Sequence, residues 1–367
     1  MKILYDHQIF SSQIYGGISR YFFELMKNFE NDNRIKYDLS LRYSNNYYLN
    51  KYNDLKYKPF FKNFTFRGKY RLINILNKNI SKKLLIKGDY DIFHPTYFDP
   101  YFLNFLNNKP FVLTIYDMIH DIYPEMFSSR DRTAERKKLL AQKATRIIAI
   151  SENTKRDIIR FFDIDENKIE VIYLANSFNM NKDDKIINVV TPEKYILFVG
   201  SRRGYKNFDL FIKTISPLLN DDVKLNVICA GGGEFNSMEI EKLKNLKIKD
   251  KVFFYSGSDS VLAYLYQKAI AFVFPSLYEG FGIPILESFA SGCPVICSKT
   301  SSLPEVAGDA VVYFDPTDKL SMLNSIKKVI YDDKLRKQLI DKGIEREKEF
   351  TWKKTADKTK KIYEKIL

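Results

Sequence analysis

The stretch FVFPSLYEGFGIPILESFASGCPVICS, residues 272–298, gives the clearest indication of the fold. An apolar run ends at Pro275, a glycine-containing loop follows, and Pro284 stands where the first turn of a helix would begin. These features predict a buried strand, a tight turn and a helix whose free backbone N–H groups can bind an anion. Glu279 in the loop and Glu287 in the helix are candidate site residues, although acids at a helix start can also serve only to complement its dipole.

Short apolar runs alternate with segments of helical periodicity along the rest of the chain, which is typical of parallel sheets with crossover helices. The expected strands are 2–5, 37–41, 92–94, 111–116, 146–150, 169–172, 195–199, 225–229, 251–254, 271–274, 295–297 and 311–314. The clearest helices are 17–29, 130–144, 208–219 and 260–268. The sequence therefore predicts an α/β fold.

A polar segment without clear periodicity, residues 176–194, reads as a linker between two halves of the chain. At about 100 to 200 residues per domain, the length of 367 residues also favours two domains. We expect two doubly wound, Rossmann-like domains, 1–178 and 179–350, facing a central cleft where ligands of open α/β sheets bind. A C-terminal helix, 351–367, is expected to return toward the N-terminal domain, and the aromatic residues of this end of the chain, Phe350, Trp352 and Tyr363, to be buried.

The composition narrows the class of protein. The chain carries 59 Lys and Arg against 45 Asp and Glu, a net charge of +14, and its 25 Tyr and 29 Phe are incompatible with a disordered chain. Three cysteines without paired spacing exclude a disulfide-stapled secreted protein. The N-terminal MKILYDHQIF is no signal peptide, and no uncharged apolar run approaches the roughly 20 residues of a membrane span. We therefore expect a cytoplasmic protein whose charge meets an acidic partner, a nucleic acid or an anionic membrane surface.

The acidic loop and helix at residues 279–287, EGFGIPILE, have an E-x7-E pattern, and PSLYEGFG, ASGCPVI and SSLPEVAGDAVVYFDP accompany it in order. Together these motifs resemble the retaining family 4 glycosyltransferases, and the resemblance extends from Gly16 to FTWKKTA at residues 350–356. It implies the GT-B fold, with an acceptor-side N-terminal domain and a C-terminal domain that binds a nucleotide sugar. Members of this kind work without a bound catalytic metal, so we expect no cofactor and no metal site.

The resemblance assigns roles around the E-x7-E pattern. Glu279 would contact hydroxyls of the transferred sugar, and Glu287 would accept hydrogen bonds from the ribose of the nucleotide. Backbone N–H groups of Phe281 and Gly282 would face the sugar and diphosphate. The loops expected to select base and sugar, 255–259 and 278–283, add Gly257 and Ile283 to the donor-binding positions.

A basic turn follows the first strand of the second half, in the segment YILFVGSRRGYKNFDLFIK. Arg202, Arg203 and Lys206 there could neutralise a departing diphosphate. By the resemblance, Lys206 matches the family's lysine, whereas either Arg202 or Arg203 could take the role of its arginine. The alternative is a solvated basic turn without a ligand.

The N-terminal half offers a second glycine-containing loop, Gly16 and Gly17, with Arg20 one turn into the following helix. The family pattern carries a GG-x-x-R loop facing the donor diphosphate or the acceptor. Two D-x-D pairs, 89–91 and 163–165, resemble metal-nucleotide motifs of another fold, but their positions favour turn formation.

Three histidines, His7, His94 and His120, fall at expected strand ends of the N-terminal half. For any one of them a structural role is the more common one, but their clustering favours a site. Many family members place a His before an Asp where this chain has Tyr116 and Asp117. Either Tyr116 or His120 would then replace the family's sugar-contacting histidine.

The leading hypothesis is a retaining hexosyltransferase that uses a nucleoside diphosphate sugar, GDP-mannose as a first guess, and a glycan acceptor that is lipid-linked. The segments YPEMF and AISENTKRDI resemble mannosyltransferase-like members that build bacterial surface polysaccharides such as O-antigen, lipopolysaccharide or capsule. A GT-B-fold nucleotide-sugar epimerase or phosphorylase, and a basic nucleic-acid-binding protein, are the alternatives. The leading hypothesis predicts no nucleic-acid partner.

A cationic surface on the N-terminal half is a further expectation. The helix 130–144 and the Lys- and aromatic-rich region 43–83 could rest on anionic lipid. This would place the protein at the inner face of the cytoplasmic membrane, although solvated helix faces would have the same composition.

Overall fold

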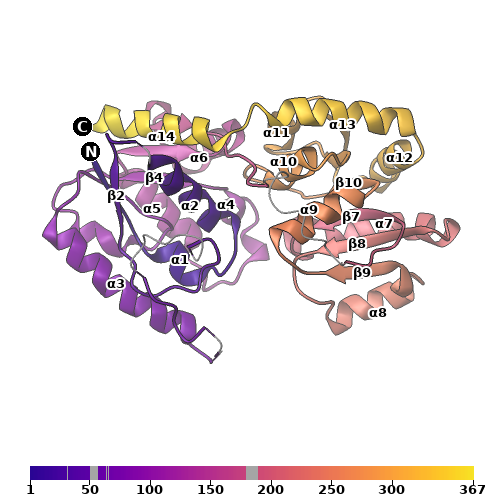
Figure 1. Ribbon diagram of the computed structural model, residues 1–367, viewed down its shortest axis with the longest axis horizontal. Coiled ribbons are helices and arrows are strands. Elements are labelled where there is room, and N and C mark those ends of the chain that lie inside the picture. Colours follow the sequence, from indigo (N-terminus) through magenta and orange to yellow (C-terminus); the bar gives the residue numbers. More distant parts are fainter. Residues whose placement is uncertain (31, 50–56, 63, 65, 179–188) are drawn as a thin grey trace. The chain divides into compact units, whose positions relative to one another are not determined.

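The computed structural model describes residues 1–30, 32–49, 57–62, 64, 66–178 and 189–367. The chain forms two compact units, one of residues 1–174 with 352–367 and the other of residues 175–351 (Figure 1). Most of the expected linker, residues 179–188, lies outside the described residues.

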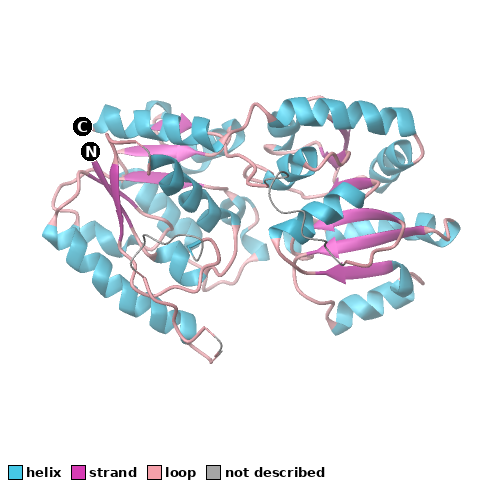
Figure 2. Cartoon of the chain, viewed as in Figure 1, coloured by secondary structure: helices cyan, strands magenta, loops and turns pink. Residues whose placement is uncertain are grey.

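The N-terminal unit is built on parallel strands with helices on both faces (Figure 2). Its strands are β1 Lys2–Tyr5, β2 Lys36–Leu39, β3 Ile92–His94, β4 Val112–Ile115, β5 Arg146–Ala149 and β6 Ile169–Val171. Its helices are α1 Gln8–Ser12, α2 Gly17–Phe29, α3 Lys69–Lys87, α4 Ile119–Ile122, α5 Thr133–Lys143, α6 Glu152–Phe162 and α14 Trp352–Ile366. The strands pair in the orders β2-β1-β3 and β4-β5-β6, and an isolated parallel bridge between Phe93 and Phe111 links the two groups.

A buried carboxylate fixes the carboxyl ends of β1 and β3. Asp6 is fully buried and accepts hydrogen bonds from the Thr96 backbone N–H (2.8 Å), the Gln8 amide (2.8 Å) and the Tyr101 hydroxyl (3.1 Å). A buried charge is tolerated only where such donors replace water. The loops that leave this sheet edge are therefore tied together at one point.

The C-terminal helix α14 packs on α2 and closes the core of the N-terminal unit. Tyr363 is fully buried, and its hydroxyl lies 2.6 Å from His94 Nδ1 and 3.1 Å from the Tyr5 hydroxyl. Trp352 is buried beside Tyr21, with ring centroids 6.3 Å apart. The expected burial of the C-terminal aromatic residues, Phe350 included, is confirmed.

The second unit holds one six-stranded parallel sheet in the order β12-β11-β10-β7-β8-β9. Its strands are β7 Lys194–Val199, β8 Leu225–Ala230, β9 Val252–Tyr255, β10 Ala271–Phe274, β11 Val295–Ser298 and β12 Val311–Phe314. Its helices are α7 Phe208–Asp221, α8 Ser237–Asn245, α9 Asp259–Lys268, α10 Ile283–Ala290, α11 Leu303–Ala307, α12 Lys319–Ile330 and α13 Asp333–Glu347. The chain runs outward from β7 to β9 and then returns to the other side of β7 as β10, so the strand order reverses between β7 and β10.

The expected α/β architecture of two Rossmann-like domains is confirmed, and each expected strand is present within two residues at either end. The expected helix 130–144 is shorter and begins at Thr133, because the Asp131 carboxylate accepts from the Thr133 backbone N–H at 2.8 Å and holds a turn. Among the described residues, no helix combines the length and apolarity that a membrane span requires.

Candidate active site

The point where the strand order reverses brings two functional loops together. Ligands of open α/β sheets bind at such a point, beyond the carboxyl ends of the strands. Residues 200–207 follow β7 and residues 275–282 follow β10, its neighbour in the sheet. The Leu277 backbone N–H donates to the Tyr205 carbonyl at 2.7 Å, which ties the two loops to each other.

Lys206 and Glu279 form an ion pair across these loops. Lys206 Nζ lies 2.6 Å from Glu279 Oε1, and the two side chains are 14% and 11% exposed. The ammonium also lies 5.2 Å from the centroids of the Tyr205 and Phe274 rings. Because the pair is only partly solvated, an anion that enters here gains a nearby cation, and the released carboxylate can accept from neutral hydroxyls.

The turn that carries Lys206 is rigidly connected to the rest of the unit. Asn207 follows it in the left-handed region, with φ 57°, and its side-chain amide donates to the Pro316 carbonyl at 2.8 Å. Asn tolerates this backbone region better than most residues. The same residue precedes α7, so Lys206 lies between a strand end and a helix start.

Two serines in the loop between β11 and α11 support the Glu279 loop. The Glu279 backbone N–H donates to Ser301 Oγ at 2.9 Å, while Ser302 Oγ donates to the carbonyls of Glu279 (2.9 Å) and Phe281 (3.0 Å). Ser301 has φ 50°, a strained conformation for a non-glycine residue that concentrates at functional sites. Sequence reasoning missed both serines as site residues, although they open the motif SSLPEVAG.

Gly282 is the residue before α10, and its backbone requires glycine. It has φ 100°, and an added Cβ would lie 2.8 Å from Leu303 Cδ2. Ile283 and Pro284 then begin the helix, while Phe281 is buried against Phe350 with ring centroids 5.8 Å apart. The backbone N–H groups at the start of α10 thus follow directly after Glu279.

Glu287 lies one turn further along α10 and is buried. The Tyr266 hydroxyl of α9 approaches its Oε2 at 3.5 Å, which is a weak contact. The carboxylate therefore belongs to the same helix as the Gly282 start, on the side facing α9. Its assignment to the ribose stays a prediction.

Arg202 makes several contacts within the unit, and its role toward a diphosphate stays a prediction. Its guanidinium donates to Glu239 Oε1 (2.8 Å) and to the carbonyls of Gly231 (3.1 Å) and Glu234 (2.9 Å). The group also lies 4.5 Å from the Phe235 ring centroid, and the side chain is 2% exposed. Arg202 therefore supports the β8–α8 loop, and a diphosphate could reach it only by breaking these contacts.

The neighbouring Arg203 is exposed, and which of the two arginines would contact a diphosphate stays a prediction. Sequence reasoning missed Glu239, whose carboxylate also accepts from the Asn236 backbone N–H in a capping box. Burial alone would raise the pKa of Glu239, but the Arg202 guanidinium and the Asn236 N–H hold it below its ordinary value. The Asn-x-x-Glu spacing, which is typical of a capping box, is the feature of the sequence that could have indicated this role of Glu239.

Local packing accounts for Gly257 among the remaining glycine predictions. A Cβ on Gly257 would lie 2.7 Å from Val261 Cβ, which explains the absence of a side chain there without a ligand. At Gly16 the nearest atoms belong to the end of the flexible Gln13 side chain, which can move aside, and Gly17 is exposed at the start of α2. Donor binding by these positions stays a prediction.

Arg20 is also committed to protein contacts. It is buried, and its guanidinium donates to the hydroxyls of Tyr48 (2.9 Å) and Tyr15 (2.6 Å) while lying against both rings. These contacts hold Arg20 against two tyrosines beside the Gly16 loop, and its role toward the donor diphosphate or the acceptor stays a prediction.

The three histidines do not form one site. His7 and His94 are buried and hydrogen-bonded inside the N-terminal unit, to Ser81 and Asn74 and to Tyr363 and Thr114. These two are structural residues, which is the more common role for a histidine.

His120 and Tyr116 remain the candidates near the end of β4. The His120 ring stacks on Phe127 at 3.8 Å and lies 3.7 Å from Asp131, and burial lowers its pKa against the opposing pull of the Asp117 carboxylate. The Tyr116 hydroxyl is buried without a hydrogen-bond partner among the described residues, and burial raises its pKa well above the ordinary value. A neutral, unpaired hydroxyl at a strand end can still bind a ligand oxygen.

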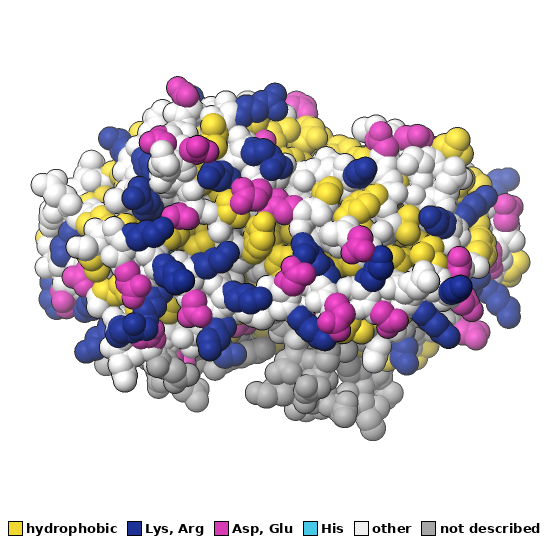
Figure 3. All heavy atoms as spheres, turned by 90° about the horizontal axis from the view of Figure 1, so that it is seen from above, with side chains coloured by type: hydrophobic (Ala, Val, Ile, Leu, Met, Phe, Trp, Pro, Cys, Tyr) yellow, Lys and Arg dark blue, Asp and Glu magenta, His cyan; other side chains and the backbone are white. Residues whose placement is uncertain are grey.

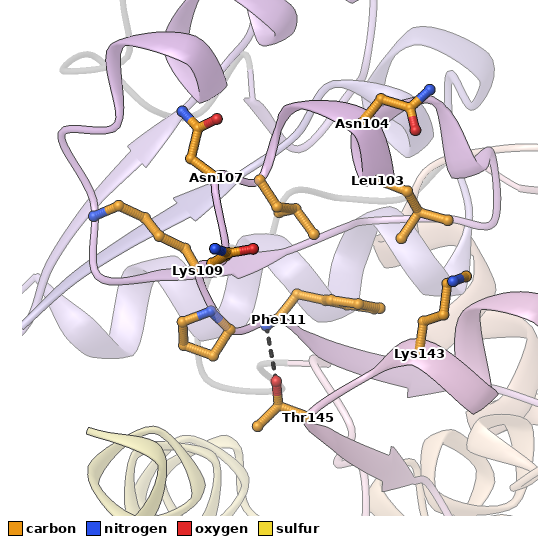
Figure 4. Close-up of a pocket in the computed structure, with 10 residues that line it drawn as sticks. Leu103, Asn104, Asn107, Lys109, Phe111, Lys143 and Thr145 are labelled. Carbon is orange, nitrogen blue, oxygen red and sulfur yellow. Dashed lines mark hydrogen bonds between the residues drawn. The ribbon is translucent and has the colours of Figure 1, made fainter.

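A hollow of about 580 Å³ lies on the opposite side of the N-terminal unit, where β4 and β5 begin (Figure 4). Phe111 and Thr145 stand at its floor, with Asn107, Lys109 and Lys143 around them. None of the predicted site residues lines this hollow. Within the described parts of the chain, no group of His, Cys, Asp or Glu is arranged to hold a metal ion.

Two family models match the chain. The description Glycosyltransferase Family 4 covers residues 15–175, and Glycosyl transferases group 1 covers residues 179–346. The two matches correspond to the two structural units and together span most of the sequence.

Characterised relatives include transferases of bacterial surface glycans. The O-antigen chain mannosyltransferase RfbU of Salmonella typhimurium is 33% identical over 218 residues, which are 59% of this chain and 60% of that protein. The O-antigen chain mannosyltransferase B of Escherichia coli is 29% identical over 265 residues, 69% of each chain. An N-acetylgalactosamine-N,N'-diacetylbacillosaminyl-diphospho-undecaprenol 4-alpha-N-acetylgalactosaminyltransferase of Campylobacter jejuni is 29% identical over 221 residues, 59% of this chain and 60% of that one. The first and third matches span less than two-thirds of the relative.

Solved structures show the same fold over the whole chain. The sucrose-phosphate synthase of Thermosynechococcus elongatus has a TM-score of 0.77 at 18% identity and covers 100% of this chain and 98% of its own. Anabaena Alr3699/HepE, in complex with UDP and glucose, has a TM-score of 0.75 at 16% identity over 99% of each chain. The expected GT-B class of fold is confirmed.

Proposed function

Because the chain belongs to the family 4 glycosyltransferases, we propose that it transfers a hexose with retention of configuration from a nucleoside diphosphate sugar to a glycan hydroxyl. The observation that carries this proposal is the Lys206–Glu279 pair at the point where the strand order reverses. A cation for a phosphate and a carboxylate for sugar hydroxyls lie there within hydrogen-bond distance of each other. The start of α10 adds backbone N–H donors immediately after Glu279.

In the proposed donor complex, the diphosphate takes Lys206 away from Glu279. The Lys206 ammonium and the exposed Arg203 guanidinium then stabilise the negative charge that grows on the leaving phosphate oxygen. Glu279, released from its ion pair, accepts hydrogen bonds from the sugar hydroxyls and sets the orientation of the anomeric carbon. Glu287 accepts from the ribose hydroxyls.

The transfer step needs no further protein base. The bond from the anomeric carbon to the phosphate oxygen breaks, and the acceptor hydroxyl attacks the same face. Its proton passes to the departing phosphate oxygen, so the products are the glycoside and the free nucleoside diphosphate. Retention follows because the bond that forms replaces the broken bond on the same face.

For the substrates, we propose mannose from GDP-mannose and a lipid-linked glycan acceptor in surface polysaccharide synthesis. Two relatives are named O-antigen chain mannosyltransferases, which supports mannose, and a third is named for a diphospho-undecaprenol acceptor, which supports a lipid carrier. A lipid-linked acceptor places the reaction at the inner face of the cytoplasmic membrane.

Thermal stabilisation by nucleotide sugars tests the donor assignment. A ligand at 100 times its dissociation constant stabilises the native state by about 2.7 kcal/mol, which corresponds to roughly 5 to 10 °C for a unit of this size. We expect GDP-mannose to raise the melting temperature more than the UDP sugars, with inorganic diphosphate as the control. Equal shifts for all sugars would contradict the assignment to mannose, and no shift with any nucleotide would contradict a donor site.

Replacing Glu287 with alanine should weaken donor binding by about 10- to 100-fold, because hydrogen bonds to a charged group contribute about 1.5 to 3 kcal/mol. Calorimetric titration of the nucleoside diphosphate measures this change. Glu241→Ala, an exposed acid of α8 in the same unit, is the matched control. Unchanged affinity in Glu287→Ala would remove the ribose role from this residue.

A further inference from the structure

Several large apolar side chains that lie close together in the sequence around the start of α3 are exposed. Phe61, Phe64 and Phe66 in the preceding loop are 62%, 72% and 44% exposed. Tyr70, Leu72 and Ile75 in the first turns of the helix are also exposed. We call these six side chains the α3 tip. A soluble protein rarely exposes such a concentration of apolar side chains unless the surface binds something.

Specific contacts hold the α3 tip in its exposed arrangement. The Lys69 side chain is buried, and its ammonium donates to the carbonyls of Phe61 (2.7 Å) and Phe64 (2.8 Å). Phe60 is buried below, and the Asn45 side chain bonds both its backbone N–H (3.0 Å) and its carbonyl (2.8 Å).

The backbone at Phe61 points to a function for this arrangement. Phe61 has φ 44°, a left-handed conformation that is costly for a bulky residue and persists only where the surroundings impose it. The loop is therefore held in a strained conformation in which the Phe61 ring faces solvent.

The inner face of α3 packs against the rest of the N-terminal unit. Ile73, Asn77, Ser81 and Leu85 recur every four residues and are buried. The helix lies along the outside of the N-terminal unit, with the loop that precedes it at its end (Figure 1). The α3 tip therefore remains outside without any rearrangement of the core.

The segment that carries the α3 tip is rich in cations. Residues 57–88 contain nine Lys and Arg and no Asp or Glu, and two of the nine, Lys78 and Lys87 further along α3, pair with Asp99 and Asp89 outside the segment. On the face shown in Figure 3, Lys and Arg side chains are interspersed with Asp and Glu. Lys58, Lys62, Arg67 and Arg71 are exposed within or next to the tip. Exposed apolar side chains with exposed cations among and next to them match a surface that is anionic outside and apolar inside.

We propose that the α3 tip is the site where this protein inserts into an anionic phospholipid bilayer. The three phenylalanines enter the boundary between headgroups and acyl chains, and Lys58, Lys62, Arg67 and Arg71 meet lipid phosphates. The α3 tip lies within region 43–83, one of the two segments for which the sequence predicts a cationic surface, and not on the other, the helix 130–144. On that helix, α5, Lys137 is buried against Asp121 and Leu139 is the one large apolar side chain among its described residues with substantial exposure.

Vesicle flotation tests insertion directly, with the full chain and vesicles of equal parts phosphatidylglycerol and phosphatidylcholine. Phe61→Ser with Phe64→Ser should lower the partition coefficient about tenfold or more, because two exposed apolar anchors are lost. Met238→Ser with Leu320→Ser removes two exposed apolar side chains of the second unit and should change nothing. Equal partitioning of the two double variants would overturn the proposal.

A charge series separates the bilayer from other polyanions. Replacing Lys62, Arg67 and Arg71 with glutamine should lower binding to the anionic vesicles about tenfold or more, whereas the same change at the exposed Lys224, Lys244 and Lys337 should have little effect. Vesicles of phosphatidylcholine alone should bind weakly. Binding to RNA that survives the phenylalanine changes, without binding to vesicles, would identify a nucleic-acid surface and overturn the proposal. Donor-induced stabilisation of each variant shows independently that the transferase site is intact.

Discussion

Replacing Lys206 with alanine is expected to lower kcat/KM for sugar transfer by about 10²-fold or more, the usual loss for one preorganised donor to a developing anion. The ammonium lies at the carboxyl end of β7, 2.6 Å from Glu279, and no other cation is proposed to reach the leaving oxygen except Arg203. The measurement is steady-state release of the nucleoside diphosphate with the donor that stabilises the protein best.

The control for this prediction is Lys213→Ala, an exposed lysine on α7 in the same unit. It removes the same side chain two turns further on and should leave transfer unchanged. Lys206→Ala also leaves Glu279 without its partner, so the melting temperature of each variant must be recorded beside its activity. Near-normal transfer by Lys206→Ala would remove the lysine from the mechanism.

Replacing Arg202 with alanine should reduce stability, by about 3 kcal/mol, because removing one partner of a buried ion pair leaves the other charge without compensation. Glu239 and two carbonyls of the β8–α8 loop would lose their donor. For a unit of this size we expect the melting temperature to fall by roughly 6 to 12 °C. Differential scanning calorimetry measures the change.

Arg203→Ala is the matched comparison, since the two residues are adjacent but only Arg203 is exposed. It should change stability by no more than about 0.5 kcal/mol and should lower kcat/KM. The opposite pattern, a stable Arg202→Ala variant that has lost transfer, would return the diphosphate role to Arg202.

Much of the fold could be predicted because the strands are short, apolar and regularly interrupted. Runs such as Phe272–Phe274 and Val295–Cys297 are buried on both faces of a parallel sheet. They are therefore continuously apolar, which makes them easy to recognise as strands in the sequence. The position of Glu279 follows from the same run, because a loop after a buried strand lies at the carboxyl edge of the sheet. The position of Lys206 can be predicted in the same way, because it lies in the loop after the first buried strand of the second unit.

The contacts that distant residues impose could not be predicted. In the sequence, Arg202 and Arg203 match the position of the family's arginine equally well. Only the folded chain shows that Arg202 is paired with Glu239, which lies 37 residues further along the sequence. The glycines before Arg20 predict that it lies near a ligand, but they do not show that its guanidinium donates to the Tyr48 hydroxyl in the folded chain. Likewise the aromatic content of region 43–83 was evident, but the exposure of Phe61 and Phe64 depends on Lys69 and its two carbonyl contacts.

The most direct test of the central claim is ¹H NMR of the protein incubated with an α-linked nucleotide sugar and a lipid-linked glycan acceptor. The predicted result is a new α-anomeric signal on the acceptor, with one nucleoside diphosphate released for each sugar transferred. A β-anomeric product would contradict retention, and conversion of the nucleotide sugar into its epimer without acceptor would contradict transfer itself.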